Sequence, residues 1–285
     1  DIAQHPECDS AIEDIINEGI VANERDQAVA IILDRIAYPK KIKDRIREEF
    51  DTVLELLDFD TKGHDIFRRW YVDGRVFYHK VIDQKNPKKG IQELRYIEPK
   101  KIRKVKEINK GVKPGTSVEL VTKVNEYYLY NDKGLKTGTT EGIKISPDSI
   151  TYVPSGLIDQ NKGHVLSYLH KAIKPVNQLR MIEEGGRGTE ITTLAGGSNL
   201  GEIDDIQYFK KKLFQSLNVP ISRLEAEAGF SLGRSTEITR DELKFTKFVQ
   251  RLRKKFTPIF TDILKSQLIL KGIITLEDWK KLSQH

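Results

Sequence analysis

Residues 70–155 constrain the fold most, because their sequence favours strands while the sequence on either side favours helices. This stretch is rich in valine, isoleucine and tyrosine, which suit a pleated, half-buried surface, and Asp73-Gly74 is a hairpin-turn signal near its start. The basic cluster Lys100–Lys104 is expected to be a solvated turn between strands. Strand-rich and helix-rich segments that are separated along a chain are typical of α+β proteins. We therefore predict an α+β fold, with long helices and a β-rich region that forms an antiparallel sheet or a small barrel.

Apolar residues recur at spacings of three and four on the N-terminal side of the β-rich region, which predicts two amphipathic helices. The first covers residues 10–23 and begins with a capping box, in which Ser10 and Glu13 satisfy backbone groups at the helix start. The second begins near Pro39, whose fixed backbone angle suits a first turn.

The same spacing predicts three helices on the C-terminal side. The helix over residues 164–184 contains Pro175, which should kink it. A shorter helix begins at Asp204, which caps it. The last helix covers residues 240–270 and contains Pro258, where it is expected to bend.

The composition allows a polyanionic partner without requiring one. Hydrophobic residues make up 38% of the 285 residues, which is enough for a sizeable core, and the 48 basic against 42 acidic residues leave a net charge of +6. Cys8 is the only cysteine, so the chain is expected to lack disulfides and cysteine zinc sites, as in a reducing compartment. We expect neither a signal peptide nor a membrane-spanning segment. Because Met181 is the only methionine, we also expect a fragment or a processed chain.

The glycine-rich segment Gly229–Ser235 is not expected to bind a nucleotide. A phosphate-binding loop follows a strand and has four residues between its glycines and then a lysine, because backbone N–H groups and the lysine surround the phosphates. Here three residues separate Gly229 from Gly233, Arg234 replaces the lysine, and a helix precedes the segment. Gly185–Gly188 likewise lacks the spacing of a dinucleotide-binding fingerprint.

Carboxylates leave one catalytic alternative open, a metal-dependent nuclease or another DNA-processing enzyme that holds Mg²⁺. Helix capping explains Asp204 and Asp205 more simply, and the histidines lack the spacing of metal ligands. We therefore predict no catalytic residues, no metal site, no cofactor and no small-molecule substrate. The carboxylates concerned are Asp58, Asp60, Asp65, Glu202, Asp204 and Asp205.

A stripe of basic residues accompanies the apolar face of the last predicted helix. Its members, Lys244, Lys247, Arg251 and Lys254, follow one another at spacings of three, four and three, so they share one helix face. A solvated face is the simpler interpretation. Nucleic-acid binding gains weight if many copies of the stripe face a common channel.

Several segments of the sequence resemble, in the same order, the portal or head-tail connector proteins of tailed bacteriophages, especially those of the large T-even-like myoviruses. These segments are QHPECDSAIEDIINEGIV, RRWYVDGRVFYHKVID, LRYIEPKKI, SYLHKAIKPVNQLRMIE and FQSLNVPISRLEAEAGFSLGRSTEITRDELKF. The last segment is the most characteristic, and the resemblance extends through nearly the whole chain.

The resemblance implies a structural protein of the virion, not an enzyme. Portal proteins form a ring of twelve subunits at a unique capsid vertex, conduct double-stranded DNA during packaging and ejection, nucleate head assembly and connect the head to the tail. The implied partners are further copies of the chain, DNA without sequence specificity, the terminase packaging motor, the major capsid and scaffold proteins, and the neck and tail proteins. Assembly is implied in the host cytoplasm or at its inner membrane.

The resemblance also implies a division of the chain into the parts of a portal subunit. Residues 1–163 would form the wing domain, 164–184 the first stem helix, 185–228 a strand and a helix that return to the wing, 229–239 the tunnel loop, and 240–285 a C-terminal helix that leads to the crown.

The tunnel loop would project toward DNA in the channel of the ring. Arg234 would contact phosphate without reading bases, and Phe230 and Leu232 would pack against the duplex or a neighbouring subunit. The implied DNA-channel residues are Gly229, Phe230, Ser231, Leu232, Gly233 and Arg234.

The sequence departs from the family after the first stem helix. In portal proteins a clip domain, which contacts the packaging ATPase, and a second stem helix follow at this point. Here Glu184 is followed directly by Gly185-Gly186. We therefore expect the clip and the return stem helix to be missing, with consequences for motor docking and ring closure.

Overall fold

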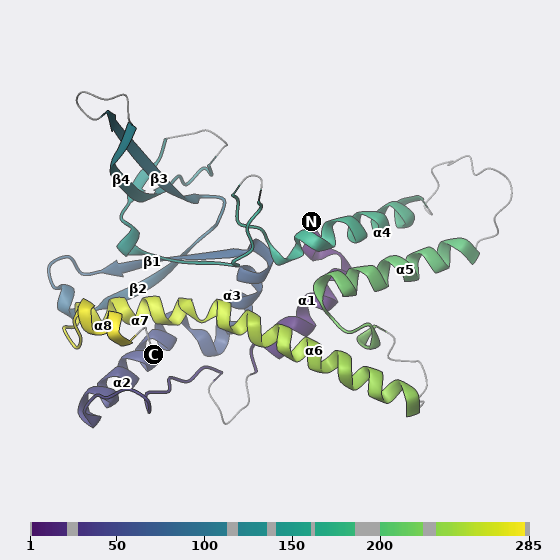
Figure 1. Cartoon of the computed structure of the whole chain (residues 1–285), viewed down its shortest axis with the longest axis horizontal. Helices are drawn as coiled ribbons and strands as arrows, with labels where there is room; N and C mark the ends of the chain where they lie inside the picture. The colour runs from purple at the N-terminus through teal and green to yellow at the C-terminus, as the bar shows by residue number, and fades with distance from the viewer. Residues whose placement is uncertain are drawn as a thin grey trace. The chain divides into compact units, whose positions relative to one another are not determined.

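The computed structural model describes residues 2–21, 28–112, 119–135, 141–160, 163–185, 200–224 and 232–282. They fold into two compact units, each built from segments that are distant in the sequence (Figure 1). The helical unit comprises Asp1–Ala28, Gly63–Gly74 and Pro154–Phe256, and the sheet unit comprises Val29–Lys62, Arg75–Val153 and Thr257–His285. Helices combined with antiparallel strands confirm the predicted α+β class. Within the described ranges, no helix has the length and apolar character needed to cross a bilayer.

Amphipathic helices form most of the helical unit. They are α1 (Pro6–Gly19), the C-terminal part of α3 (Phe59–Asp73), α4 (Ile173–Gly185), α5 (Leu200–Leu217) and α6 (Leu232–Phe256), with the short 3-10 helices η1 (Ile2–Gln4), η4 (Tyr168–Ala172) and η5 (Ile221–Arg223). Aromatic side chains join α3 to α6, because the rings of Phe67 and Trp70 have their centres 5.0 and 5.4 Å from that of Phe256. All three side chains are buried, so they belong to the core of this unit.

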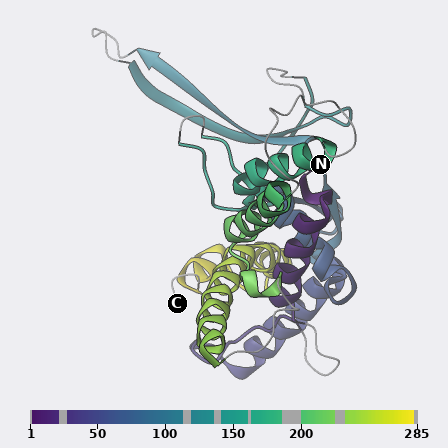
Figure 2. The same cartoon turned by 90° about the vertical axis from the view of Figure 1, so that its right-hand side faces the viewer.

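The helix pair α4 and α5 extends from this core. The two helices lie side by side and run in opposite directions (Figures 1 and 2), and Leu179 of α4 and Leu213 of α5 are fully buried. Asn218 ends α5 by adopting a left-handed backbone conformation, with φ of 61°, which asparagine tolerates better than most residues. Val219-Pro220 follow, and proline does not continue a helix. Helix α5 is thus a helix that returns alongside α4 and ends at Asn218.

Two three-stranded sheets and the helices around them form the sheet unit. The strands are β1 (Arg75–Ile82), β2 (Ile91–Ile97), β3 (Ile102–Val112), β4 (Glu119–Tyr130), β5 (Ile143–Ile145) and β6 (Ile150–Pro154), accompanied by α2 (Lys40–Leu57), α7 (Pro258–Leu270), α8 (Leu276–Leu282), η2 (Pro87–Lys89) and η3 (Pro147–Ser149). The strand orders are β2-β1-β6 and β3-β4-β5. Figure 2 shows β3 and β4 as a long two-stranded ribbon, whose strands pair antiparallel.

Both sheets contribute to one apolar cluster. Its buried members are Phe77, Ile97, Ile102, Tyr128 and Ile150. Helix α7 packs against α2 elsewhere in the unit, and the fully buried Gln267 of α7 connects three elements. Its Oε1 accepts a hydrogen bond from the Ile91 N–H at 2.7 Å, and its Nε2 donates to Glu49 at 2.8 Å. Both ends of the buried amide are therefore satisfied, which burial requires.

The start of the β-rich region was predicted wrongly. Residues 70–73 belong to α3, and Asp73-Gly74 is the end of that helix, not a hairpin turn. Phe67, Trp70 and Tyr71 follow helical spacing and are all buried, so packing overrides their preference for strands. Gly74 has φ of 70°, and a Cβ at this position would lie 2.6 Å from the carbonyl oxygen of Leu166, so only glycine fits there.

The basic cluster at Lys100–Lys104 was also predicted wrongly in part, because β3 begins at Ile102. Ile102 is buried, whereas Lys104, two residues further on and on the same face of the strand, is exposed. Lys104 lies 2.8 Å from Glu126 of the neighbouring strand. The start of β3 therefore belongs to the apolar core, and Lys104 lies where the strand has left that core.

The predicted helices exist, but several of their boundaries differ. The first helix begins at Pro6 and not at residue 10, and the helix predicted near Pro39 begins at Lys40. The helix predicted over residues 164–184 begins as η4 and becomes α4 only at Ile173. Pro175 therefore lies in the first turn, where no intrahelical hydrogen bond is lost, so the predicted kink is wrong.

Two further corrections concern the last helices. Helix α5 begins at Leu200, so Asp204 lies within it and is not its cap. The single helix predicted over residues 240–270 consists of α6, which begins at Leu232, and α7, in which Pro258 occupies the first position. The strand expected within residues 185–228, over Glu190–Leu194, lies outside the described residues.

Candidate functional site

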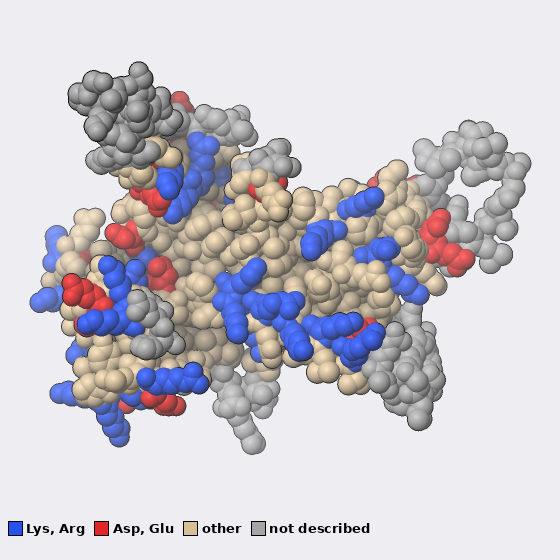
Figure 3. Space-filling model, in the orientation of Figure 1, with Lys and Arg blue, Asp and Glu red and all other residues tan. Residues whose placement is uncertain are grey.

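Three members of the predicted basic stripe line a depression on the helical unit. They are Lys244, Lys247 and Arg251 of α6. The opposite wall is the C-terminal end of α5 and the turn after it, including Gln215 and Asn218. Figure 3 shows lysine and arginine side chains gathered along α6. The stripe is therefore a wall of a concave surface.

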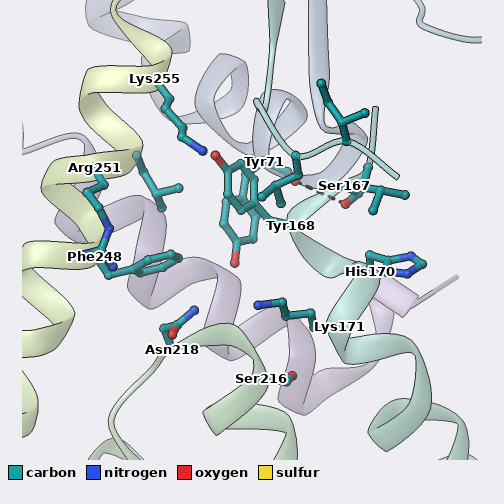
Figure 4. A pocket seen from close by; sticks show the side chains of 14 residues that line it. Tyr71, Ser167, Tyr168, His170, Lys171, Ser216, Asn218, Phe248, Arg251 and Lys255 are labelled. Atoms are coloured by element: carbon teal, nitrogen blue, oxygen red, sulfur yellow. Dashed lines mark hydrogen bonds between the residues drawn. The ribbon is translucent and has the colours of Figure 1, made fainter. Parts of the chain in front are cut away.

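A cavity of about 390 Å³ adjoins this depression. Phe248, Arg251 and Lys255 of α6 lie on one side of it, and His170 and Lys171 of η4 lie on the other (Figure 4). The depression and the cavity share Asn218, Phe248 and Arg251, so they are continuous. We refer to them together as the basic groove, whose cationic residues are Lys171, Lys244, Lys247, Arg251 and Lys255.

Two stacked tyrosines form an aromatic wall of the cavity. The rings of Tyr71 and Tyr168 lie parallel, with an interplanar angle of 6° and 5.0 Å between their centres, and Trp70 packs against Tyr168 at 5.3 Å. Tyr71 is at the end of α3, whereas Tyr168 begins η4. The stack therefore joins two segments that are far apart in the sequence, and it gives the groove a rigid aromatic wall.

Hydrogen bonds fix the η4 side of the groove. Ser167 caps η4, because its Oγ accepts from the Leu169 N–H at 3.0 Å and donates to the Val72 carbonyl at 2.6 Å. The Tyr168 hydroxyl donates to the Ser155 carbonyl at 2.8 Å. Lys171 belongs to η4, so these hydrogen bonds also fix the position of its backbone.

Burial makes the two tyrosines poor acids. It raises the pKa of the Tyr168 hydroxyl to about 12 and also raises the pKa of Tyr71 strongly. Both hydroxyls therefore stay protonated at neutral pH, and neither is suited to act as a general base.

The charge of the groove is strongly one-sided. Among the residues that the structure describes, its lining includes the five lysine and arginine side chains named above and one carboxylate, Asp241. Asp241 is already engaged, since the Lys244 Nζ donates to it at 3.0 Å. Cations on a concave surface focus the electrostatic potential and attract anions. The arrangement therefore suits phosphate groups, and the aromatic wall suits a flat or apolar part of the same ligand.

The structure describes the side chains of all carboxylates of the alternative nuclease hypothesis except Glu202, which lies outside the described side chains. Among the side chains that the structure describes, Asp58, Asp60, Asp65, Asp204 and Asp205 form no group of three that could share a metal ion. Asp204 and Asp205 are exposed on α5. Asp58 pairs with Lys62 at 2.9 Å, and hydrogen bonds from Lys62 and Thr61 hold its pKa below the usual value.

The predicted channel residues are placed only in part. Leu232, Gly233 and Arg234 lie in the first turn of α6, so the predicted loop over residues 229–239 is too long at its C-terminal end. Gly229, Phe230 and Ser231 lie outside the described residues, as do the side-chain positions of Leu232 and Arg234. Their role at DNA remains a prediction.

Sequence reasoning missed part of the groove. Lys254 is exposed on α6 but does not line the groove, whereas Lys255 does. Spacings of three, four and four connect Lys244, Lys247, Arg251 and Lys255 on one face, so the periodicity could have identified Lys255. No sequence signal connects Lys171 and His170 to α6, because they are some 80 residues away in the chain.

Comparisons with known proteins point to one family. The chain matches the family model described as Bacteriophage T4-like portal protein (Gp20) over residues 1–185 and 183–285. It is 34% identical to the portal protein of Vibrio phage KVP40 over 362 aligned positions, which cover 98% of this chain and 70% of that protein. It is 29% identical to the portal protein of Salmonella phage ViI over 367 positions, which cover 98% of this chain and 65% of that protein.

These alignments also show a difference in length between this chain and its relatives. Both alignments are longer than the 285 residues of the chain. The relatives therefore carry residues within the aligned region that have no counterpart here. The family match is split into two segments that meet at residues 183–185, the junction at which the sequence departs from the family pattern.

Proposed function

The chain belongs to the family of bacteriophage T4-like portal proteins, and from this premise we propose that it is a subunit of a ring through which double-stranded DNA passes at one capsid vertex. It acts by shape and charge, without chemistry of its own. The observation that carries this proposal is the basic groove, whose described lining includes five cationic side chains and one carboxylate.

Phosphate contacts suit a DNA conduit for a physical reason. They attract any duplex equally, because the backbone carries no sequence information, and they weaken steeply with salt, because binding releases counterions. One such contact is weak. Several subunits around a common axis repeat the contact. When one contact breaks, the others keep the DNA close, so the effective concentration of the broken contact stays high and it can re-form quickly.

The position of Arg234 supports a second contact on the same helix. Arg234 lies in the first turn of α6, where unpaired backbone N–H groups and the helix dipole favour phosphate. Lys244 lies ten residues further along the same helix, which corresponds to about 15 Å. A duplex that follows α6 would therefore meet Arg234 and then the basic groove.

We infer that the clip is what this chain lacks relative to its family. Helix α4 ends at Gly185 and α5 begins at Leu200, and α5 returns alongside α4. Helix α5 would then take the place of the return stem helix, which revises the expectation that both parts are missing. Without a clip, this chain would offer no docking site to the terminase motor, while contacts with capsid, neck and tail proteins would be retained.

The proposal predicts salt-sensitive binding of DNA without sequence preference. We expect the purified chain to bind two unrelated duplexes with the same affinity, and the logarithm of the binding constant to fall linearly with the logarithm of the salt concentration. Replacing Arg234 by alanine should remove about one phosphate contact and lower the slope by roughly 0.9. Fluorescence anisotropy at several salt concentrations measures both quantities, with Lys41→Ala, an exposed position on α2, as the control.

Three outcomes would contradict the proposal. A preference for one duplex would indicate base recognition. Loss of ring formation in Arg234→Ala, measured by native mass spectrometry, would indicate a structural role for this residue. Cleavage of DNA in the presence of Mg²⁺ that Asp204→Ala abolishes would indicate a nuclease.

A further inference from the structure

A histidine and two glutamates converge at the N-terminal end of α1. His5 occupies the position before α1, Glu7 lies in its first turn, and Glu183 lies in the last turn of α4. One ligand atom from each residue lies within 4.8 Å of the others. We refer to these residues as the His5 cluster. It joins segments that are nearly 180 residues apart, so no local motif predicts it.

The burial of His5 is unusual for a residue without hydrogen bonds. Its side chain is 5% exposed, yet among the described residues neither ring nitrogen has a hydrogen-bond partner of acceptable geometry. The Nδ1 lies 3.0 Å from a Glu7 oxygen and the Nε2 lies 3.7 Å from a Glu183 oxygen. A buried polar group that is left unsatisfied costs about 1–3 kcal/mol. The cluster therefore calls for an occupant that both carboxylates and the imidazole can bind.

The donor set suits a metal ion. One imidazole nitrogen and two carboxylate oxygens are typical zinc ligands, with bonds of about 2.0–2.2 Å, and three protein ligands leave one position open for water. Tetrahedral bonds of that length place ligand atoms about 3.4 Å apart. One atom from each of the three residues lies within 4.8 Å of the others, so a single imidazole nitrogen and the two carboxylates can close around an ion with small side-chain movements. Mg²⁺ is a poorer match, because it prefers oxygen ligands.

One neighbouring cation limits the choice of ligand atom. Lys210 of α5 lies 2.7 Å from Oε1 of Glu7. The other oxygen of Glu7, Oε2, is buried without a hydrogen bond and is the one close to His5. The salt bridge therefore fixes the Glu7 carboxylate while leaving one oxygen for the cluster.

We propose that the His5 cluster binds Zn²⁺ and thereby ties the segment before α1 to the C-terminal end of α4. This site is independent of the proposed role at DNA, since none of its residues lines the basic groove. Glu183 precedes Gly185, where α4 ends and the sequence departs from the family pattern. The ion would thus stabilise the end of α4 at this junction.

Zinc analysis of the full chain tests the proposal. After removal of metal with a chelator and dialysis against Zn²⁺, we expect about one Zn²⁺ per chain and a higher midpoint of thermal unfolding than in the metal-free protein, because a ligand that binds only the folded state stabilises it. Glu183→Gln should weaken zinc binding about tenfold or more, and His5→Gln should abolish it. Glu184→Gln and His170→Gln are matched controls and should bind zinc as the wild type does.

Glu183 is half-exposed, so the fold should tolerate Glu183→Gln. The test therefore stands even if His5→Gln fails to fold. Stoichiometric zinc in the wild type, with a zinc affinity that falls in Glu183→Gln but not in Glu184→Gln, supports the site. Absence of zinc from the wild type, or equal zinc binding by Glu183→Gln and Glu184→Gln, overturns it, and the cluster is then an ion pair between the histidine and the carboxylates. Replacing Zn²⁺ by Mg²⁺ should raise neither the bound metal nor the unfolding midpoint.

Discussion

Replacing Lys247, Arg251 and Lys255 together by glutamine is expected to weaken DNA binding about 100-fold at low salt, because each neutralised phosphate contact removes its share of counterion release. The slope of the logarithm of the binding constant against the logarithm of salt should fall by about 2–3 for the same reason. The folded structure should tolerate the change, since these side chains line a surface groove. Anisotropy titrations with a duplex at several salt concentrations measure both effects.

A control with the same change in charge separates the groove from net charge. Lys40, Lys41 and Lys85 are exposed residues of the sheet unit, and their replacement by glutamine should lower the affinity far less. On α6 itself, Lys254→Gln should have a smaller effect than Lys255→Gln, because only Lys255 lines the groove. If the groove variant and the charge control lose the same affinity, the groove is not a DNA site. The groove variant could instead form fewer rings, while each ring that does form binds DNA as the wild type does. In that case the groove is a contact between subunits.

The spacing of apolar residues predicted the helices and most of the sheet, because it shows which face of a helix or strand is buried. It failed where tertiary packing outweighs local preference. Trp70 and Tyr71 have aromatic side chains that favour strands, but both are buried in α3 against residues from distant segments. The glycine that follows, Gly74, was interpreted as a hairpin signal because the same left-handed conformation also ends helices.

Of the residues that line the basic groove, the sequence could predict only those that lie on the single helix α6. The spacing of Lys244, Lys247 and Arg251 shows that they share a face, but the sequence does not show that this face is concave. The opposite wall comes from η4 and the end of α5, which the fold brings to α6. For the same reason the sequence contains no sign of the His5 cluster, whose ligands come from the start of α1 and the end of α4.

A buried lysine in the sheet unit leads to the largest expected effect on stability. Lys80 of β1 has a side chain that is only 5% exposed. Its Nζ donates to Asp262 at 3.1 Å and to Ser266 at 2.9 Å, both in α7. The Thr151 hydroxyl of β6 donates to the same Asp262 oxygen at 2.7 Å. Asp262 therefore compensates a buried ammonium group and also connects two strands to a helix.

Asp262→Ala is expected to lower the free energy of unfolding of the sheet unit by about 3 kcal/mol, because it leaves the Lys80 ammonium buried without a counter-charge. This value is at the lower end for a broken buried pair, since Asp262 is 40% exposed and water can replace part of its interaction. Urea denaturation followed by hydrogen exchange on peptides of the sheet unit measures the loss. Asp132→Ala is the matched control: it breaks a pair of the same length, 3.1 Å, with Lys101 in the same unit, but Asp132 is 81% exposed and little change is expected.

The double variant Lys80→Met with Asp262→Ala distinguishes the cost of an unpaired charge from the loss of packing. Removing both charges leaves no buried ion to solvate, so most of the stability lost in Asp262→Ala should return. Methionine retains the length and apolar stem of the lysine, which keeps the space beside α7 filled. If the double variant is as unstable as Asp262→Ala, the carboxylate stabilises the unit through its hydrogen bond from Thr151 and not by compensating Lys80. If Asp262→Ala alone costs no more than Asp132→Ala, the Lys80 ammonium reaches water and the pair contributes as little as a surface ion pair.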